Sequence, residues 1–111
     1  MTISQILHLQ SMNACSIYLL PQGAFYHVYN EGAEKLSMVT GYKIRKGSVY
    51  ARSNVNLSKK YRFRCIGSIN YTFCGFPISA LDNVIVRLVK HFAPLPIGIE
   101  HIDTAIVIII G

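Results

Sequence analysis

The chain has 111 residues, of which 51% are hydrophobic and 14% are charged. This length and composition suit one compact core and exclude an intrinsically disordered chain. The three cysteines lack C-x-x-C spacing and no signal peptide is apparent, which predicts a protein of the reducing cytoplasm. The four histidines are scattered, so we expect no metal site. The longest apolar run, residues 105–110, is too short for a membrane helix and predicts a buried strand.

A helix and two strands are predicted at the beginning of the chain. Residues 3–14 have the spacing of an amphipathic helix, and its apolar face comprises Ile3, Ile6, Leu7 and Met12. Residues 16–20 predict a strand that ends at Pro21. Residues 24–29 predict a second strand with two alternating faces. One face carries Ala24, Tyr26 and Val28, and the other carries Phe25, His27 and Tyr29. We expect Tyr26 and Val28 to be buried.

The middle of the chain predicts a second helix and then a β-hairpin. Asn30 is a typical N-cap residue and Gly41 is placed to end the helix. Strand signals return at residues 42–52 and 57–66, around the polar turn Ser53-Asn54. The second of these strands alternates cations with apolar residues, so one face is cationic. This cationic face carries Lys60, Arg62 and Arg64.

The last third of the chain predicts a strong amphipathic helix and one or two final strands. Gly75 and Pro77 are interpreted as a loop. The helix then begins at Ser79, the first residue of a capping-box-like motif, and continues to Phe92 with i, i+3, i+4 apolar spacing. Residues 97–110 supply the strands. The order of elements predicts an α/β fold, a mixed β-sheet packed by about three helices.

Positive charge is concentrated in one stretch of the sequence. The net charge is +6, and residues 43–64 contain no Asp or Glu. Eight of the eleven Lys and Arg residues, which we call the basic stripe, lie there: Lys43, Arg45, Lys46, Arg52, Lys59, Lys60, Arg62 and Arg64. Such clustering is typical of a protein that binds a polyanion. The alternative is a solvated surface that maintains solubility.

Two motifs of the chain are similar to those of a known family. The first is Gly23-Ala24-Phe25-Tyr26-His27-Val28-Tyr29, followed by Asn30-Glu31-Gly32-Ala33-Glu34-Lys35. The second is Cys74-Gly75-Phe76-Pro77-Ile78-Ser79-Ala80-Leu81-Asp82-Asn83. By their order and spacing, residues 3 to about 103 resemble the N-terminal mismatch-recognition domain (domain I) of MutS DNA-repair proteins. The chain thus resembles a stand-alone MutS domain-I-like protein, with a longer insertion at residues 47–69.

The resemblance implies a single MutS domain-I-like nucleic-acid-binding domain over residues 1–111. Phe25 matches the family's Phe, which stacks on a mispaired base from the minor groove. His27 stands where the family has a Glu that hydrogen-bonds this base. An imidazole suits a phosphate, a base acceptor or a ribose hydroxyl better than it replaces a carboxylate. Without the resemblance, Phe25 is read as a core aromatic and His27 as a polar residue beside the core.

We therefore expect a non-catalytic binding module without a cofactor or metal, since no nucleophile–base spacing and no phosphate-binding loop occur. The expected ligand is duplex DNA or an RNA–DNA hybrid. The expected contact residues are Phe25, His27 and the eight residues of the basic stripe. The resemblance suggests an accessory subunit in DNA repair or in a reverse-transcriptase or mobile-element system, with a protein partner that supplies catalysis. A homodimer is a further option, and no membrane contact is expected. The alternative is an interaction domain that docks an acidic protein partner.

Overall fold

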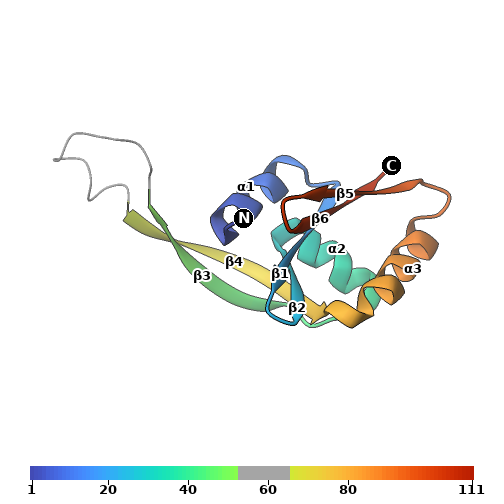
Figure 1. Cartoon of the computed structure of the whole chain (residues 1–111), viewed down its shortest axis with the longest axis horizontal. Helices are drawn as coiled ribbons and strands as arrows, with labels where there is room; N and C mark the ends of the chain where they lie inside the picture. Colours follow the sequence, from blue (N-terminus) through green and yellow to red (C-terminus); the bar gives the residue numbers. More distant parts are fainter. Residues whose placement is uncertain (53–65) are drawn as a thin grey trace.

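The computed structural model describes residues 1–52 and 66–111 (Figure 1). The predicted turn Ser53-Asn54 and the predicted strand at residues 57–66, apart from Ile66, lie outside these residues. The described residues form three α-helices, six strands and one 3-10 turn. In chain order they are α1 (Ile3–Met12), β1 (Ser16–Gln22), β2 (Phe25–Tyr29), α2 (Asn30–Thr40), β3 (Arg45–Arg52), β4 (Ile66–Pro77), η2 (Ile78–Ala80), α3 (Leu81–Phe92), β5 (Ile97–Ile102) and β6 (Ala105–Ile110).

The six strands form one sheet in the order β3-β4-β2-β1-β6-β5, and each neighbouring pair is antiparallel. The expected α/β architecture with three helices is therefore confirmed, whereas the expectation of a mixed sheet is wrong, because each pairing of the described strands is antiparallel. Three of the pairs join consecutive strands: β1 with β2, β3 with β4, and β5 with β6. Antiparallel pairing of this kind needs only short connections.

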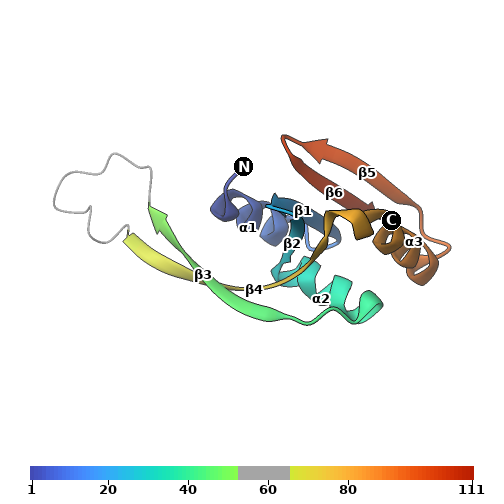
Figure 2. The ribbon, with the colours of Figure 1, turned by 60° about the horizontal axis from the view of Figure 1, so that its bottom comes forward.

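Helices cover both faces of the sheet, because the inner strands are apolar on both sides. Buried side chains of β1 alternate between two clusters, with Ile17 and Leu19 in one and Tyr18 and Leu20 in the other. The first cluster includes residues of α2 and α3, and the second includes residues of α1. We call these sides of the sheet the α2/α3 face and the α1 face. Figure 2 shows α1 and α2 on opposite sides of β1 and β2.

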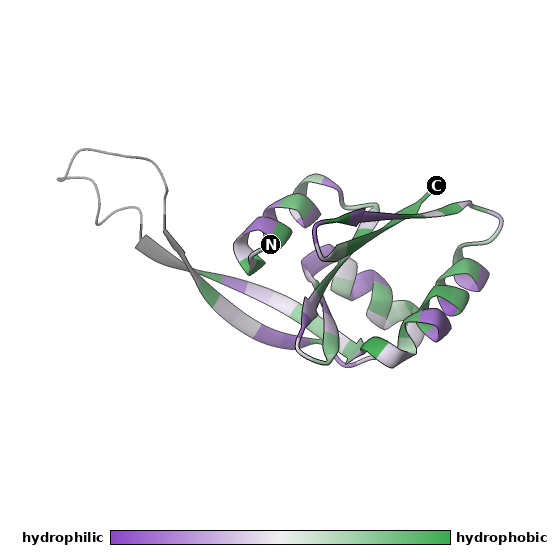
Figure 3. Cartoon of the chain, in the orientation of Figure 1, coloured by the Kyte–Doolittle hydropathy of each residue, from purple (hydrophilic) through white to green (hydrophobic). Residues whose placement is uncertain are grey.

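The final strand is the most apolar element of the sheet. β6 is coloured hydrophobic along its length in Figure 3, and four of its six residues, from Ala105 to Ile108, are buried. The prediction of a buried strand at residues 105–110 is confirmed. Burial on both faces explains why its sequence is a continuous apolar run rather than an alternating one.

Strand β4 was not expected, and two of its residues were wrongly interpreted as a loop. Gly75 and Pro77 lie within β4, opposite His27 and Phe25 of β2. A Cβ atom at Gly75 would lie 2.9 Å from Cδ2 of His27, so the glycine here serves close side-chain approach. Isolated glycines in strands commonly have this role.

Helix ends also differ from the predictions. Asn30 is not the N-cap of α2; it is the first helical residue, with φ of 47°. Its side-chain Oδ1 accepts a hydrogen bond from the backbone N–H of Thr72 at 3.1 Å. Ser79 lies in η2, and α3 begins at Leu81 without a side-chain cap. Gly41 ends α2 as predicted, in the left-handed conformation with φ of 79°.

Two predictions at the beginning of the chain were also wrong in detail. Met12 is 68% exposed and does not join the apolar face of α1. Strand β1 does not end before Pro21 but continues to Gln22. Pro21 pairs with Tyr26 in the register of β1 and β2. Because β6 pairs with β1 only as far as Leu19, one side of β1 is an open edge at Pro21, where a residue without a backbone N–H is tolerated.

One buried polar residue links α1 to the rest of the molecule. Gln10 is fully buried. Its Nε2 donates to the carbonyl of Ser16 at 2.7 Å, and its Oε1 accepts from the backbone N–H of Tyr18 at 3.1 Å. A Cβ atom at Gly32 of α2 would lie 2.4 Å from this Oε1. The amide therefore occupies space that only a glycine in α2 leaves open.

Candidate nucleic-acid interface

The α1 face is covered at one end of β2 and open at the other. Phe25, His27 and Tyr29 share this face, as the alternation predicts. Tyr29 is 1% exposed beneath α1, whereas Phe25 is 47% exposed. On the opposite face, Val28 is buried as predicted, whereas Tyr26 packs against the core but is only partly buried.

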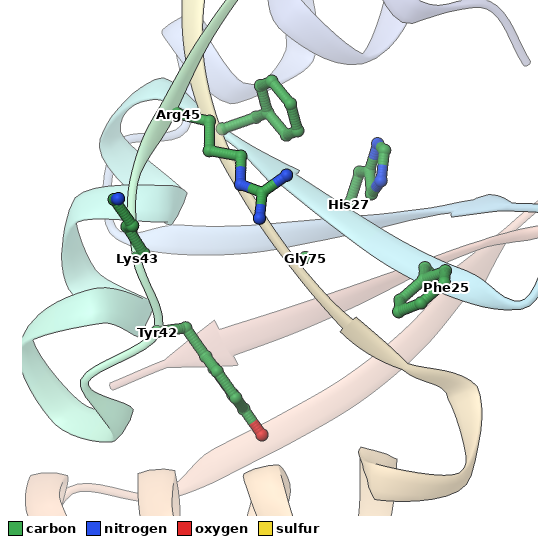
Figure 4. A pocket seen from close by; sticks show the side chains of 7 residues that line it. Phe25, His27, Tyr42, Lys43, Arg45 and Gly75 are labelled. Carbon is green, nitrogen blue, oxygen red and sulfur yellow. The ribbon is translucent and has the colours of Figure 1, made fainter.

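The open end contains a cavity of about 390 Å³, which we call the aromatic pocket. It is lined by Phe25, His27, Tyr42, Lys43, Arg45, Phe73 and Gly75. Figure 4 shows that Phe25 and His27 project from β2, while the Arg45 side chain reaches from β3 across β4. Four of the predicted contact residues therefore meet at one cavity: Phe25, His27, Lys43 and Arg45.

Strand register brings these side chains together. His27 pairs with Gly75, so the imidazole lies beside a residue without a side chain. Phe73 pairs with Arg45 of β3 on one side and with Tyr29 of β2 on the other. Residues directly opposite one another in antiparallel strands point to the same face. Three strands thus contribute to one surface.

Aromatic rings form a continuous floor beside this pocket. The ring centroids of His27 and Phe73 are 5.1 Å apart, at an interplanar angle of 36°. Tyr29 and Tyr71 extend the cluster, with centroids 5.2 Å apart in an edge-to-face arrangement. Gly47 leaves room for Tyr71, since a Cβ atom there would lie 2.7 Å from its ring. Aromatic pairs at such distances stabilise one another, so the floor is pre-formed.

The pocket combines neutral aromatic surface with positive charge. Burial lowers the pKa of His27 below its ordinary value of 6.5, because desolvation disfavours the imidazolium. At neutral pH His27 is therefore uncharged and offers one donor and one acceptor. Lys43 and Arg45 are exposed. None of the residues that line the pocket is acidic.

The rest of the basic stripe is distributed differently. Lys46 follows Arg45 in β3 and therefore points to the α2/α3 face, away from the pocket. Arg52 is the last residue of β3, where it pairs with Ile66. Lys59, Lys60, Arg62 and Arg64 lie outside the described residues. Alternation along residues 45–46 was a sequence signal that these two cations would face opposite sides.

Sequence reasoning missed Tyr42, Phe73 and Gly75 as pocket residues. Tyr42 stacks on Phe76, with ring centroids 6.0 Å apart and an interplanar angle of 15°. Alternation of large apolar and small or polar residues in 69–74 could have indicated β4, and with it Phe73. The position of Tyr42 depends on how α2 leads into β3, for which the sequence carries no signal.

The thiol and metal chemistry of the described residues is limited. Cys74 is fully buried, and desolvation raises its pKa to about 11, so it behaves as a small apolar residue. Within residues 1–52 and 66–111, no three His, Cys, Asp or Glu side chains gather as metal ligands. No helix in the same ranges has the length and hydropathy to cross a membrane.

Comparison of this chain with protein families, with curated proteins and with solved structures found no match. The chemistry of the pocket is therefore the basis on which a function can be inferred.

Proposed function

We propose that this chain is a non-catalytic nucleic-acid-binding module whose aromatic pocket receives a base. The observation that supports it is the meeting of aromatic rings and two cations, without a carboxylate, around one cavity of about 390 Å³. Phe25 is the exposed ring and stacks on the base. Lys43 and Arg45 contact the phosphates beside it.

The energetics of each contact suit this ligand. Stacking of a base on an aromatic side chain contributes about 1–3 kcal/mol and tolerates any base. Each phosphate contact releases counterions, which gives a salt dependence with a slope of about −0.9 per phosphate for duplex DNA. Four to six contacts from the basic stripe correspond to a slope of roughly −4 to −5. Neutral His27 donates to, or accepts from, the base edge or a ribose hydroxyl.

The resemblance to MutS domain I favours duplex DNA or an RNA–DNA hybrid as the ligand. On this proposal the protein acts in the cytoplasm as an accessory subunit, in DNA repair or in a reverse-transcriptase or mobile-element system. A protein partner then supplies catalysis. Because His27 stands at the position of the family's Glu, the mismatch itself need not be the ligand.

A second candidate function is the docking of an acidic protein partner. Exposed apolar residues on α3 favour it, since Val86 and Val89 are 48% and 46% exposed. Exposed apolar groups bordered by charge are common in protein interfaces. In this case the cations of the pocket pair with carboxylates rather than phosphates.

The test is fluorescence anisotropy with five ligands: matched DNA duplex, duplex with one G·T mismatch, single-stranded DNA, single-stranded RNA and an RNA–DNA hybrid. Arg45→Ala is compared with Lys90→Ala, which removes an exposed cation on α3. We expect micromolar or tighter binding that Arg45→Ala weakens and Lys90→Ala preserves. If none of the ligands binds at about 50 mM salt, where phosphate contacts are strongest, the proposal fails and the acidic-partner function replaces it.

A further inference from the structure

Strands β3 and β4 leave the sheet together as a two-stranded ribbon (Figures 1 and 2). β2 pairs with β4 from Phe73 to Pro77, whereas β3 pairs with β4 from Ile66 to Phe73. The residues of β4 before Phe73 therefore pair with β3 alone. We call residues 46–52 and 66–72 the ribbon. The ribbon is two strands wide, whereas the rest of the sheet is wider.

One face of the ribbon carries adjacent polar side chains at the end nearest the sheet. Lys46 lies opposite Thr72, and Ser48 lies opposite Asn70. Lys46, Ser48 and Asn70 are exposed, and Thr72 is half-buried. We call these four residues the ribbon patch. Three of them, Lys46, Asn70 and Thr72, border a cavity of about 420 Å³ together with Asn30, Gly47 and Tyr71.

The ribbon patch offers hydrogen-bonding groups and no negative charge. Lysine is a donor, the asparagine amide both donates and accepts, and the hydroxyls do either. From Lys43 to Leu81 the sequence contains no Asp or Glu. A polyanion can therefore approach the ribbon patch without meeting a carboxylate from residues 43–81. Uncharged polar side chains and a lysine are also among the groups that form hydrogen bonds with base edges.

We propose that the ribbon lies in the major groove of duplex DNA, with the ribbon patch against the base edges. This inference depends on the proposed function, and it names the ligand and the groove. The major groove of B-form DNA is about 12 Å wide and admits a two-stranded β-ribbon. Asparagine pairs with adenine, lysine with guanine, and serine or threonine with either. The major groove of A-form RNA is too deep and narrow for side chains to read.

The ribbon patch and the aromatic pocket contact different segments of the nucleic acid. Arg45 and Lys46 are neighbours in β3 and point to opposite faces. A duplex on the ribbon patch therefore leaves the aromatic pocket open on the other side. The two contacts are separable by mutation, which makes the ribbon testable independently of Phe25.

The experiment is selection of the tightest-binding sites from a randomised DNA-duplex library, with wild type and with Asn70→Ala. Asn83→Ala is the matched control, because Asn83 is an exposed asparagine on α3. Enriched sites are then measured as plain DNA, as DNA with 7-deazapurines, which lack the N7 acceptor in the major groove, and as RNA duplex. Substitution of exposed Asn70 or Asn83 leaves the core intact.

We expect enrichment of a sequence by wild type, about tenfold weaker binding by Asn70→Ala, and no change in Asn83→Ala, since one bidentate base contact is worth about this factor. The 7-deazapurine and RNA duplexes are expected to bind at least tenfold more weakly. Equal binding of RNA and DNA duplexes, or of plain and 7-deazapurine DNA, overturns the major-groove inference and leaves the proposed function standing. Binding without any effect of Asn70→Ala also overturns it. Absence of all nucleic-acid binding overturns the proposed function itself.

Discussion

The two faces of the sheet differ in how completely helices cover them. On the α2/α3 face, Phe76 is fully buried between the sheet and its helices. On the α1 face, Phe25 is 47% exposed, although it lies on the neighbouring strand. Two helices, α2 and α3, cover one face, whereas α1 alone packs on the other and leaves part of it exposed. The uncovered part retains aromatic side chains and gains cations from β3, and it is there that we place the binding function.

The largest expected effect tests this contrast directly, with the same substitution on each face. Phe76→Ala should lower the free energy of unfolding by about 3–5 kcal/mol, because it leaves a cavity in the core. Phe25→Ala should lower it by less than about 1 kcal/mol, since the ring is half in solvent. Chemical denaturation measures both. Equal losses would mean that Phe25 is a core residue and not a free surface ring.

A second substitution tests the contact between α1 and α2 at the buried amide. Gly32→Ala places a methyl group against Oε1 of Gln10, and overpacking of this kind costs about 1–3 kcal/mol. Gly98→Ala on β5 is the control, because its Cβ atom would meet Ile109 at an ordinary 4.0 Å. We expect the melting temperature to fall for Gly32→Ala and to stay unchanged for Gly98→Ala. If Gly32→Ala is as stable as wild type, the Gln10 side chain can adopt another conformation that accommodates the methyl group.

A third substitution fills part of the aromatic pocket from the β4 side. Gly75→Ala places a Cβ atom 2.9 Å from the His27 ring, which can turn toward the pocket. We expect a loss of about 1 kcal/mol in stability. The displaced ring occupies the pocket, so we also expect nucleic-acid affinity to fall by about tenfold, the order of one lost base stack. Anisotropy titration measures the second effect. Unchanged affinity with reduced stability would separate His27 from the ligand site.

The smallest effect concerns pH and sharpens the description of His27. Burial lowers its pKa in the folded state below that in the unfolded state. The unfolded chain therefore takes up the proton first as pH falls below about 6.5, and stability decreases until the folded pKa is passed. Denaturation between pH 7.5 and 5 should show a smaller decrease for His27→Gln than for wild type. The same decrease in both would assign it to other groups.

Much of the fold was predictable because it depends on local periodicity. Alternation in residues 25–29 and the helical spacing that ends at Phe92 each reflect one face packed against a core. The pocket was only half predictable. Phe25 and Arg45 were identified from motif and charge, but their meeting depends on β4 lying between β2 and β3. Gly75 and Pro77 resembled loop residues locally, and only the pairing with β2 makes them part of a strand.

Asn30 shows how the molecule ends a sheet where one strand continues further than its neighbour. β2 ends at Tyr29, which leaves the next backbone donor of β4, that of Thr72, without a strand partner. The Asn30 side chain accepts this hydrogen bond in place of a backbone carbonyl. Open strand edges invite pairing with other chains and thereby aggregation. By accepting this hydrogen bond, Asn30 removes the first donor on the open edge of β4, the position at which a foreign strand would begin to extend the ladder of β2.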